Sequence, residues 1–185
     1  MSELDSILAD IKTGEAINAA RRDWNPHYQG EIDIRIAADG SWFHQQRPFQ
    51  RDSLVKLFAG ILRREDEEYF LVTPAEKLRI EVEDAPFIAT LVECIEADGQ
   101  QAIVFTTNIG ERIVADHKHA IRVETDADSN TPRPYVHVRD GLDALISRSA
   151  FYDLLNLAQE NERDGTGYLS VTSLGEEFEL GSTDE

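Results

Sequence analysis

The sequence is poor in cysteine and in positive charge, and it has no long run of apolar residues. Cys94 is the one cysteine, which excludes an internal disulfide and a cysteine-based zinc site. No apolar run approaches the roughly 20 residues needed to cross a bilayer. The start, MSELDSILADIK, is acidic and lacks the apolar core of a signal peptide. These absences predict a cytoplasmic protein.

Positive charge is scarce. The 185 residues hold 18 Lys and Arg against 36 Asp and Glu, for a formal net charge of −18. A protein that neutralises nucleic-acid phosphates or anionic lipids needs a basic face. Here the basic residues are scattered, and the only doublets, Arg21-Arg22 and Arg63-Arg64, lie beside acids. We therefore predict neither a nucleic-acid partner nor a membrane partner.

Recognisable catalytic motifs are also absent. The chain has no H-E-x-x-H helix, no Gly-x-Ser-x-Gly elbow and no phosphate-cradling glycine loop. Asp116, His117 and His119 are metal-capable groups, but they occupy a polar connection that reads as a solvated turn. His44 lies on a predicted hairpin and is more typical of a strand face than of a base. We predict no metal, no cofactor and no catalytic residue, so the sequence leans away from an enzyme.

The best-patterned stretch begins with a hairpin around Asp39-Gly40. Ile32, Ile34 and Ile36 alternate within the segment 31–37, the period of a half-buried strand. Asp and Gly tolerate the positive φ of tight turns. A short return strand is predicted from Trp42 to Pro48.

A helix and two strands are predicted to follow this hairpin. The helix has one apolar stripe from Leu54 to Leu62 and carries Arg63 and Arg64 in its last turn. The strands are Tyr69–Thr73 and the alternating segment Leu78–Val82.

A fainter copy of this pattern occupies residues 140–180. It repeats the Asp-Gly turn, an amphipathic helix, a Tyr-led strand and an alternating strand, about a hundred residues on, too long a period for a solenoid. The fold class we predict is α+β: two related β-rich domains from an internal duplication, each with an amphipathic helix packed on an antiparallel sheet. The domains are 1–84, with a leading amphipathic helix, and 85–185. The proline after Glu83-Asp84 favours a hinge between them.

Polar groups at strand ends are the best binding candidates. Thr106-Thr107-Asn108 with Gly110 forms a turn whose N–H groups and side chains suit an anion. Arg51, just before the first helix, can pair with a carboxylate or phosphate in bidentate fashion. Lys77 follows a strand at a chain reversal. A structural salt bridge or turn contact remains the alternative for each.

Four stretches together resemble the bacterial family called domain of unknown function 1285. They are DGSWFHQQRPFQRDSLVKLFAGILRRE, YFLVTPAEK with IEVEDAPF, FTTNIGE, and VRDGLDALISRSAFYDLL. The resemblance runs from about Asn25 to Gly181. Gln46 departs from it, at a position where many relatives have glycine, and this bears on hairpin geometry alone.

The resemblance implies a duplicated core whose C-terminal half is similar to a pleckstrin-homology domain. It also implies a nucleotide-like ligand in the cleft between the domains and a role in signalling. Matched motif by motif, the cleft candidates are Arg51, Lys77, Glu81, Thr107, Asn108 and Arg122.

Three classes of function stay open. The first is a non-enzymatic binding protein for a small anionic ligand held between the domains. The second is a protein-interaction module that uses the C-terminal half or the N-terminal helix. The third is a hydrolase or transferase that uses carboxylates and His44, with a base within hydrogen-bond reach of its substrate.

Overall fold

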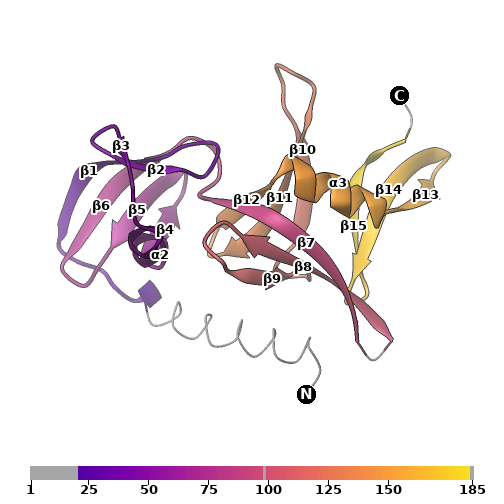
Figure 1. Ribbon diagram of the computed structural model, residues 1–185, viewed down its shortest axis with the longest axis horizontal. Coiled ribbons are helices and arrows are strands. Elements are labelled where there is room, and N and C mark those ends of the chain that lie inside the picture. The colour runs from indigo at the N-terminus through magenta and orange to yellow at the C-terminus, as the bar shows by residue number, and fades with distance from the viewer. Residues whose placement is uncertain (1–20, 98, 184–185) are drawn as a thin grey trace.

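The protein is built mainly of β-strands. The computed structural model describes residues 21–97 and 99–183, which contain fifteen strands and two helices in three sheets. Figure 1 shows two halves side by side along the long axis, the first in indigo to magenta and the second from magenta to yellow. The chain therefore has two β-rich domains. The leading helix predicted before residue 21 lies outside the described residues.

The first domain forms one six-stranded sheet in the order β3-β2-β1-β6-β5-β4. Its strands are β1 (Tyr28–Ile36), β2 (Trp42–His44), β3 (Arg47–Pro48), β4 (Leu62–Glu65), β5 (Glu68–Val72) and β6 (Glu76–Val82). β1 and β6 pair in parallel, whereas the other neighbours are antiparallel. Helix α2 (Asp52–Ala59) connects β3 to β4.

The second domain has a six-stranded sheet in the order β10-β11-β12-β7-β8-β9 and a three-stranded sheet, β13-β14-β15. The larger sheet consists of β7 (Phe87–Ala97), β8 (Gln100–Thr107), β9 (Arg112–Val114), β10 (Ile121–Thr125), β11 (Pro132–Arg139) and β12 (Leu142–Ile146). The smaller consists of β13 (Gln159–Arg163), β14 (Thr166–Ser173) and β15 (Glu176–Ser182). Helix α3 (Arg148–Asn156) joins the two, and Ser147 caps its start by accepting from the Ala150 N–H.

The alternation in the first strand is confirmed. Ile34 and Ile36 are buried and Ile32 is half-buried, so one face of β1 packs on the core. Gly40 has a φ of +83°, as a tight turn after Asp39 requires. The hairpin is closed by the pairing of Ile36 with Trp42.

Helix α2 is shorter than its apolar stripe predicted. It ends at Ala59 with Gly60 as its cap, and the residues from Leu62 to Glu65 form strand β4 instead. Arg63 and Arg64 are therefore strand residues, contrary to the prediction. The reason is that the chain turns back at Asp66, which has a φ of 54°, and pairs β4 with β5.

The predicted α+β class is wrong, because neither domain is a helix packed on a sheet. The two helices among residues 21–97 and 99–183 have 8 and 9 residues. Ala59 is the buried residue of α2, whose Leu57 is 60% exposed. Hydrophobic burial comes mainly from the sheets, and α3 adds Ala150 and Leu154.

The six-stranded sheets of the two domains share one topology. Each consists of two three-stranded antiparallel meanders joined by a parallel pair of their first and sixth strands, β1 with β6 in the first domain and β7 with β12 in the second. The predicted match of residues 140–180 to the first domain does not follow this repeat, because β13–β15 form a separate sheet. The structure does not confirm a pleckstrin-homology-like second domain.

One apolar core runs across the domain boundary. The cluster of buried side chains includes Ile34, Ile36 and Trp42 of the first sheet together with Phe87 and Phe105 of the second. This shared core leaves only the rim of the boundary for polar side chains and solvent-filled hollows.

Hydrogen bonds fix the connection between the domains. Asp84 accepts hydrogen bonds from the Arg133 guanidinium at 2.6 Å and from the Tyr135 hydroxyl at 2.8 Å. Ala85 and Pro86 are buried. The predicted hinge is therefore fixed to β11.

No helix within the described residues is long and apolar enough to span a bilayer.

Candidate functional site

Polar contacts join the two domains around the rim of their shared core. They all pair a side chain with a backbone carbonyl or a carboxylate of the other domain. Besides the bonds of Arg133 and Tyr135 to Asp84, they are, as donor and acceptor, Asn108 Nδ2 to Gly40 O at 3.4 Å, Arg139 Nη2 to Ala59 O at 2.8 Å, Arg64 Nη1 to Gly141 O at 3.2 Å, and Arg22 Nε to Asp140 Oδ2 at 2.8 Å. The Asp39-Gly40 and Asp140-Gly141 turns thus both lie at this boundary.

The larger hollow at the boundary is a cleft between α2 and the turn that follows β8; we call it the α2 cleft. It has a volume of about 490 Å³. The lining residues are Asp52, Val55 and Lys56 of α2, with Thr90, Thr107, Asn108, Ile109 and Gly110 of the second domain. Most of them are exposed, so the cleft is open to solvent.

Thr107 and Asn108, two of the residues predicted from sequence, meet in this cleft. Thr107 is buried, and its hydroxyl accepts from the Glu111 N–H at 3.1 Å, which closes the turn. The Asn108 side chain accepts from the Ile88 N–H at 3.1 Å and donates to Gly40 O. Asn108 therefore holds the turn against the first domain while its residue stays exposed.

Lys56 was not singled out from the sequence, yet it supplies the positive charge of the α2 cleft. Its Nζ lies 3.9 Å from the place where a Cβ on Gly110 would stand, so it faces the turn across the boundary. Among the described residues the ammonium makes no hydrogen bond or ion pair. The Ile109 N–H is likewise without a hydrogen-bond partner in that part of the chain. A cation and a backbone donor are thus available at one turn.

The other four predicted residues lie elsewhere. Arg51 is the cap residue of α2, exposed and next to Asp52 of the cleft. Lys77 pairs with Glu65 at 2.6 Å and covers the ring of Phe70.

Glu81 lines a separate hollow of about 410 Å³ on the first sheet, beside Glu31 and Arg79. Arg122 stands on β10 and pairs with Glu124 and Asp143. Thr107 and Asn108, which are adjacent in the chain, both line the α2 cleft with Arg51 nearby, whereas Lys77, Glu81 and Arg122 lie away from it.

Arg122 belongs to a chain of charged side chains on the second sheet. Asp143 is 15% exposed, accepts from His137 Nδ1 at 2.9 Å and pairs with the Arg122 guanidinium at 3.1 Å. Burial raises the pKa of the Asp143 carboxyl. The His137 hydrogen bond and the Arg122 charge lower the pKa by more than burial raises it, so it lies below its ordinary value. The ionised carboxylate thereby stabilises the fold.

Asp143→Asn is expected to lower the free energy of unfolding at neutral pH by about 2 kcal/mol, because a charged acceptor of two donors is lost. A carboxyl whose pKa is lowered by folding contributes stability above its unfolded pKa and loses it as pH falls through the folded pKa. The difference between variant and parent should therefore shrink in acid. Urea unfolding at a series of pH values measures it. Asp153→Asn, at an exposed site on α3, is the control; equal losses in both variants would contradict the assignment.

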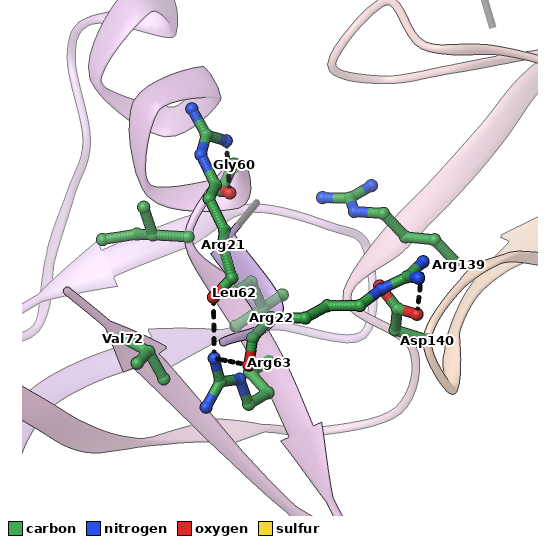
Figure 2. A pocket seen from close by; sticks show the side chains of 9 residues that line it. Arg21, Arg22, Gly60, Leu62, Arg63, Val72, Arg139 and Asp140 are labelled. Carbon is green, nitrogen blue, oxygen red and sulfur yellow. Dashed lines mark hydrogen bonds and ion pairs between the residues drawn. The ribbon is translucent and has the colours of Figure 1, made fainter. Parts of the chain in front are cut away.

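A cluster of arginines occupies another part of the boundary (Figure 2). Arg21 Nη1 donates to Gly60 O at 2.5 Å, and Arg139 donates to Ala59 O. The last carbonyls of a helix lack partners within it and carry the negative end of its dipole. These two arginines therefore cap the C-terminus of α2. Figure 2 shows Arg63 reaching back to the carbonyls of residues 21 and 22.

Two small hollows adjoin at this cluster. The one in Figure 2 has a volume of about 50 Å³. The second, which we call the basic hollow, has about 140 Å³ and is lined by Arg22, Lys118, His119, His137, Val138, Arg139 and Asp140. The basic residues that looked scattered in sequence are gathered here by the fold. The described residues contain no group of three or more His, Cys, Asp and Glu side chains placed to hold a metal ion.

His44 lies apart from both hollows. It is exposed at the end of β2, and its ring stacks on Phe49 with the centroids 6.4 Å apart. Within the described residues the His44 ring is not paired with a carboxylate, so nothing there orients it as a base.

Comparisons with known proteins agree along most of the chain. Residues 21–85 match the family model "Domain of unknown function (DUF1285), N-terminal domain", and residues 86–180 match "Protein of unknown function (DUF1285), C-terminal domain". The crystal structure of a DUF1285 family protein from Silicibacter pomeroyi is 41% identical, with a TM-score of 0.79 over 91% of this chain and 96% of that one. One from Shewanella baltica is 31% identical, with a TM-score of 0.52 over 66% and 90%. No curated protein matches.

Proposed function

Because the chain belongs to the DUF1285 family, whose function is unknown, its role must be inferred from its own geometry, and we propose that it binds a small phosphorylated, nucleotide-like ligand in the α2 cleft. On this proposal it is a binding protein rather than an enzyme, with a signalling role. The observation that carries the proposal is the unpaired Lys56 ammonium facing the turn Thr107–Gly110 across the domain boundary.

The cleft supports this ligand class in size and chemistry. Its volume of about 490 Å³ falls within the usual range for small-molecule sites, roughly 300–1,000 Å³. Lys56 and the Ile109 N–H suit phosphate oxygens, because an ammonium and a backbone donor both bind anions. Val55 and Ile109 offer apolar surface for a flat ring.

A ligand between the domains would also report on their arrangement. Lys56 comes from the first domain, and the turn comes from the second. A phosphate held by both adds a contact across the boundary at a point where solvent now enters. Such a ligand binds the folded state only, so tighter binding gives a larger increase in the free energy of unfolding.

ADP is the probe for this proposal. At a concentration 100 times its Kd, it is expected to raise the free energy of unfolding by about 2.7 kcal/mol. Lys56→Met should weaken ADP binding about tenfold, the equivalent of one charge-assisted hydrogen bond. Thermal unfolding at constant ionic strength, with calorimetric titration, measures both.

Lys118→Met, a change of an exposed lysine in the basic hollow, is the matched control and should leave ADP binding unchanged. The proposal fails if ADP, AMP and pyrophosphate all leave the protein's melting temperature unchanged, or if Lys56→Met binds them as tightly as the parent.

A protein partner is the second candidate function, and exposed leucines favour it. Leu57 is 60% exposed and Leu91 is 47% exposed, and each follows a residue that lines the α2 cleft. Binding of an apolar peptide here would survive Lys56→Met and be lost in Leu57→Glu, the reverse of what the nucleotide-like ligand requires.

A further inference from the structure

The basic hollow concentrates positive charge on a protein of net charge −18. Its wall holds Arg22, Lys118 and Arg139 as permanent cations and two imidazoles, against the single carboxylate of Asp140. Arg22 and Asp140 neutralise each other, and Arg139 is matched by Glu111 behind it. The Lys118 ammonium makes no hydrogen bond or ion pair with any described residue. The hollow thus keeps a net positive charge at its mouth.

The groups around Lys118 are held in place by their own contacts. Asp116 Oδ1 accepts from the N–H groups of Lys118 and His119, both at 2.8 Å, which fixes the turn that carries them. His119 Nδ1 donates to the carbonyl of His137 at 3.1 Å. His137 Nδ1 donates to Asp143, which leaves its Nε2 as the ring nitrogen not engaged there. A fixed set of donors costs little entropy when a ligand binds.

The Arg22–Asp140 ion pair can open, so that Arg22 binds an anion in place of Asp140. Its side chains are 53% and 35% exposed, and an ion pair at such a site contributes about 1 kcal/mol or less. An anion in the hollow can therefore take the outer nitrogens of Arg22 from Asp140 at small cost. The Arg139 side chain is 10% exposed and remains paired with Glu111 at the base of the hollow.

The size of the hollow selects a small ligand. A volume of about 140 Å³ corresponds to a few water molecules at roughly 30 Å³ each. This accommodates one phosphate group, whereas a whole nucleotide does not fit inside it. Charge-assisted hydrogen bonds from ammonium and guanidinium groups are the contacts that a phosphate dianion forms best.

We propose that the basic hollow is an oxyanion site that binds a phosphate ion or the phosphate group of a small monoester. Lys118 supplies its main charge, and Arg22 supplies further hydrogen bonds. Because Arg22 belongs to the first domain and Lys118 to the second, the bound phosphate links them. The site is independent of the α2 cleft, since no residue lines both.

Inorganic phosphate and methyl phosphate are the probes, titrated at constant ionic strength so that screening of surface charge does not change. We expect the amide resonances of Lys118, His119 and Asp140 to shift in two-dimensional NMR spectra, with saturation in the millimolar range. Lys118→Met should weaken phosphate binding about tenfold. The side chain has no partner among the described residues, so the variant should keep the parent melting temperature.

Lys56→Met, the matched change on the α2 cleft, should leave phosphate shifts at the basic hollow intact. The proposal is overturned if Lys118→Met binds phosphate as the parent does, if the shifts map to the α2 cleft instead, or if phosphate produces no saturable shift at all. Loss of ADP binding in Lys56→Met with retention of phosphate binding supports both sites, and the two proposals fail on different variants.

Discussion

Replacement of Gly40 by alanine is expected to lower the free energy of unfolding by about 3 kcal/mol, from backbone strain and overpacking together. A φ of +83° disfavours any residue with a Cβ. A Cβ at this position would also lie 2.6 Å from Ile88 Cγ1 and 2.8 Å from Asn108 Nδ2. Both atoms belong to the second domain, and the Asn108 amide is engaged with Ile88 N–H and Gly40 O. The added methyl therefore pushes against the domain boundary.

Gly165→Ala separates strain from contact. Gly165 has a φ of +82°, and a Cβ there meets nothing within 4 Å. The free energy of unfolding of this control variant should fall by about 1 kcal/mol, from backbone strain alone. Urea unfolding of both variants measures the difference, which reports the contact between the Asp39-Gly40 turn and the second domain. Equal losses in the two variants would show that the turn does not press on Ile88 and Asn108.

Local structure was largely predictable from the sequence, because alternation and turn chemistry act over a few residues. Ile34 and Ile36 alternate with polar residues, and the strand they predict is confirmed. The Asp-Gly turns are confirmed as well, with positive φ at Gly40 and Gly141. The end of α2 was missed because Leu62 packs inward either as helix or as strand, so burial alone does not distinguish them.

The assembly of the sheets was not predictable in this way. A period of two residues says which face of a strand is buried and nothing about its neighbour in the sheet. The parallel pairing of β1 with β6, and of β12 with β7, joins strands far apart in sequence. Each pairing joins two three-stranded meanders into one six-stranded sheet, and the pattern within a meander does not show which strands will meet.

The residues of the candidate site were likewise predictable from the sequence only where they form a local motif. Thr107 and Asn108 form a local turn motif, and the structure places them in the α2 cleft. Lys56 carried no signal, because an exposed lysine on an amphipathic helix is the ordinary solvated case. The basic hollow was invisible for a different reason: Arg22, Lys118 and His137 come together only through the contact between domains. The Arg21-Arg22 doublet and His119 were its traces in the sequence.

Arg139→Met is expected to lower the free energy of unfolding by about 3 kcal/mol, because both of its acceptors lose their partner. The Arg139 side chain is 10% exposed, and its Nη1 lies 2.8 Å from each carboxylate oxygen of Glu111. Its Nη2 donates to Ala59 O, a buried residue at the end of α2. Methionine also lacks the guanidinium carbon that lies over the Phe87 ring, 5.2 Å from its centroid, and it leaves that carbonyl unsatisfied.

Two variants test whether the fork geometry, and not charge alone, joins the domains. Arg139→Lys keeps the charge but cannot reach Glu111 and Ala59 O with one planar fork, so its loss should fall between parent and Arg139→Met. Arg163→Met removes an arginine that is 61% exposed and paired with Glu177 and Glu179. An exposed pair of this kind contributes about 1 kcal/mol or less. Urea unfolding ranks the three variants; a loss in Arg139→Met no greater than in Arg163→Met would mean that the boundary is held by the shared apolar core alone.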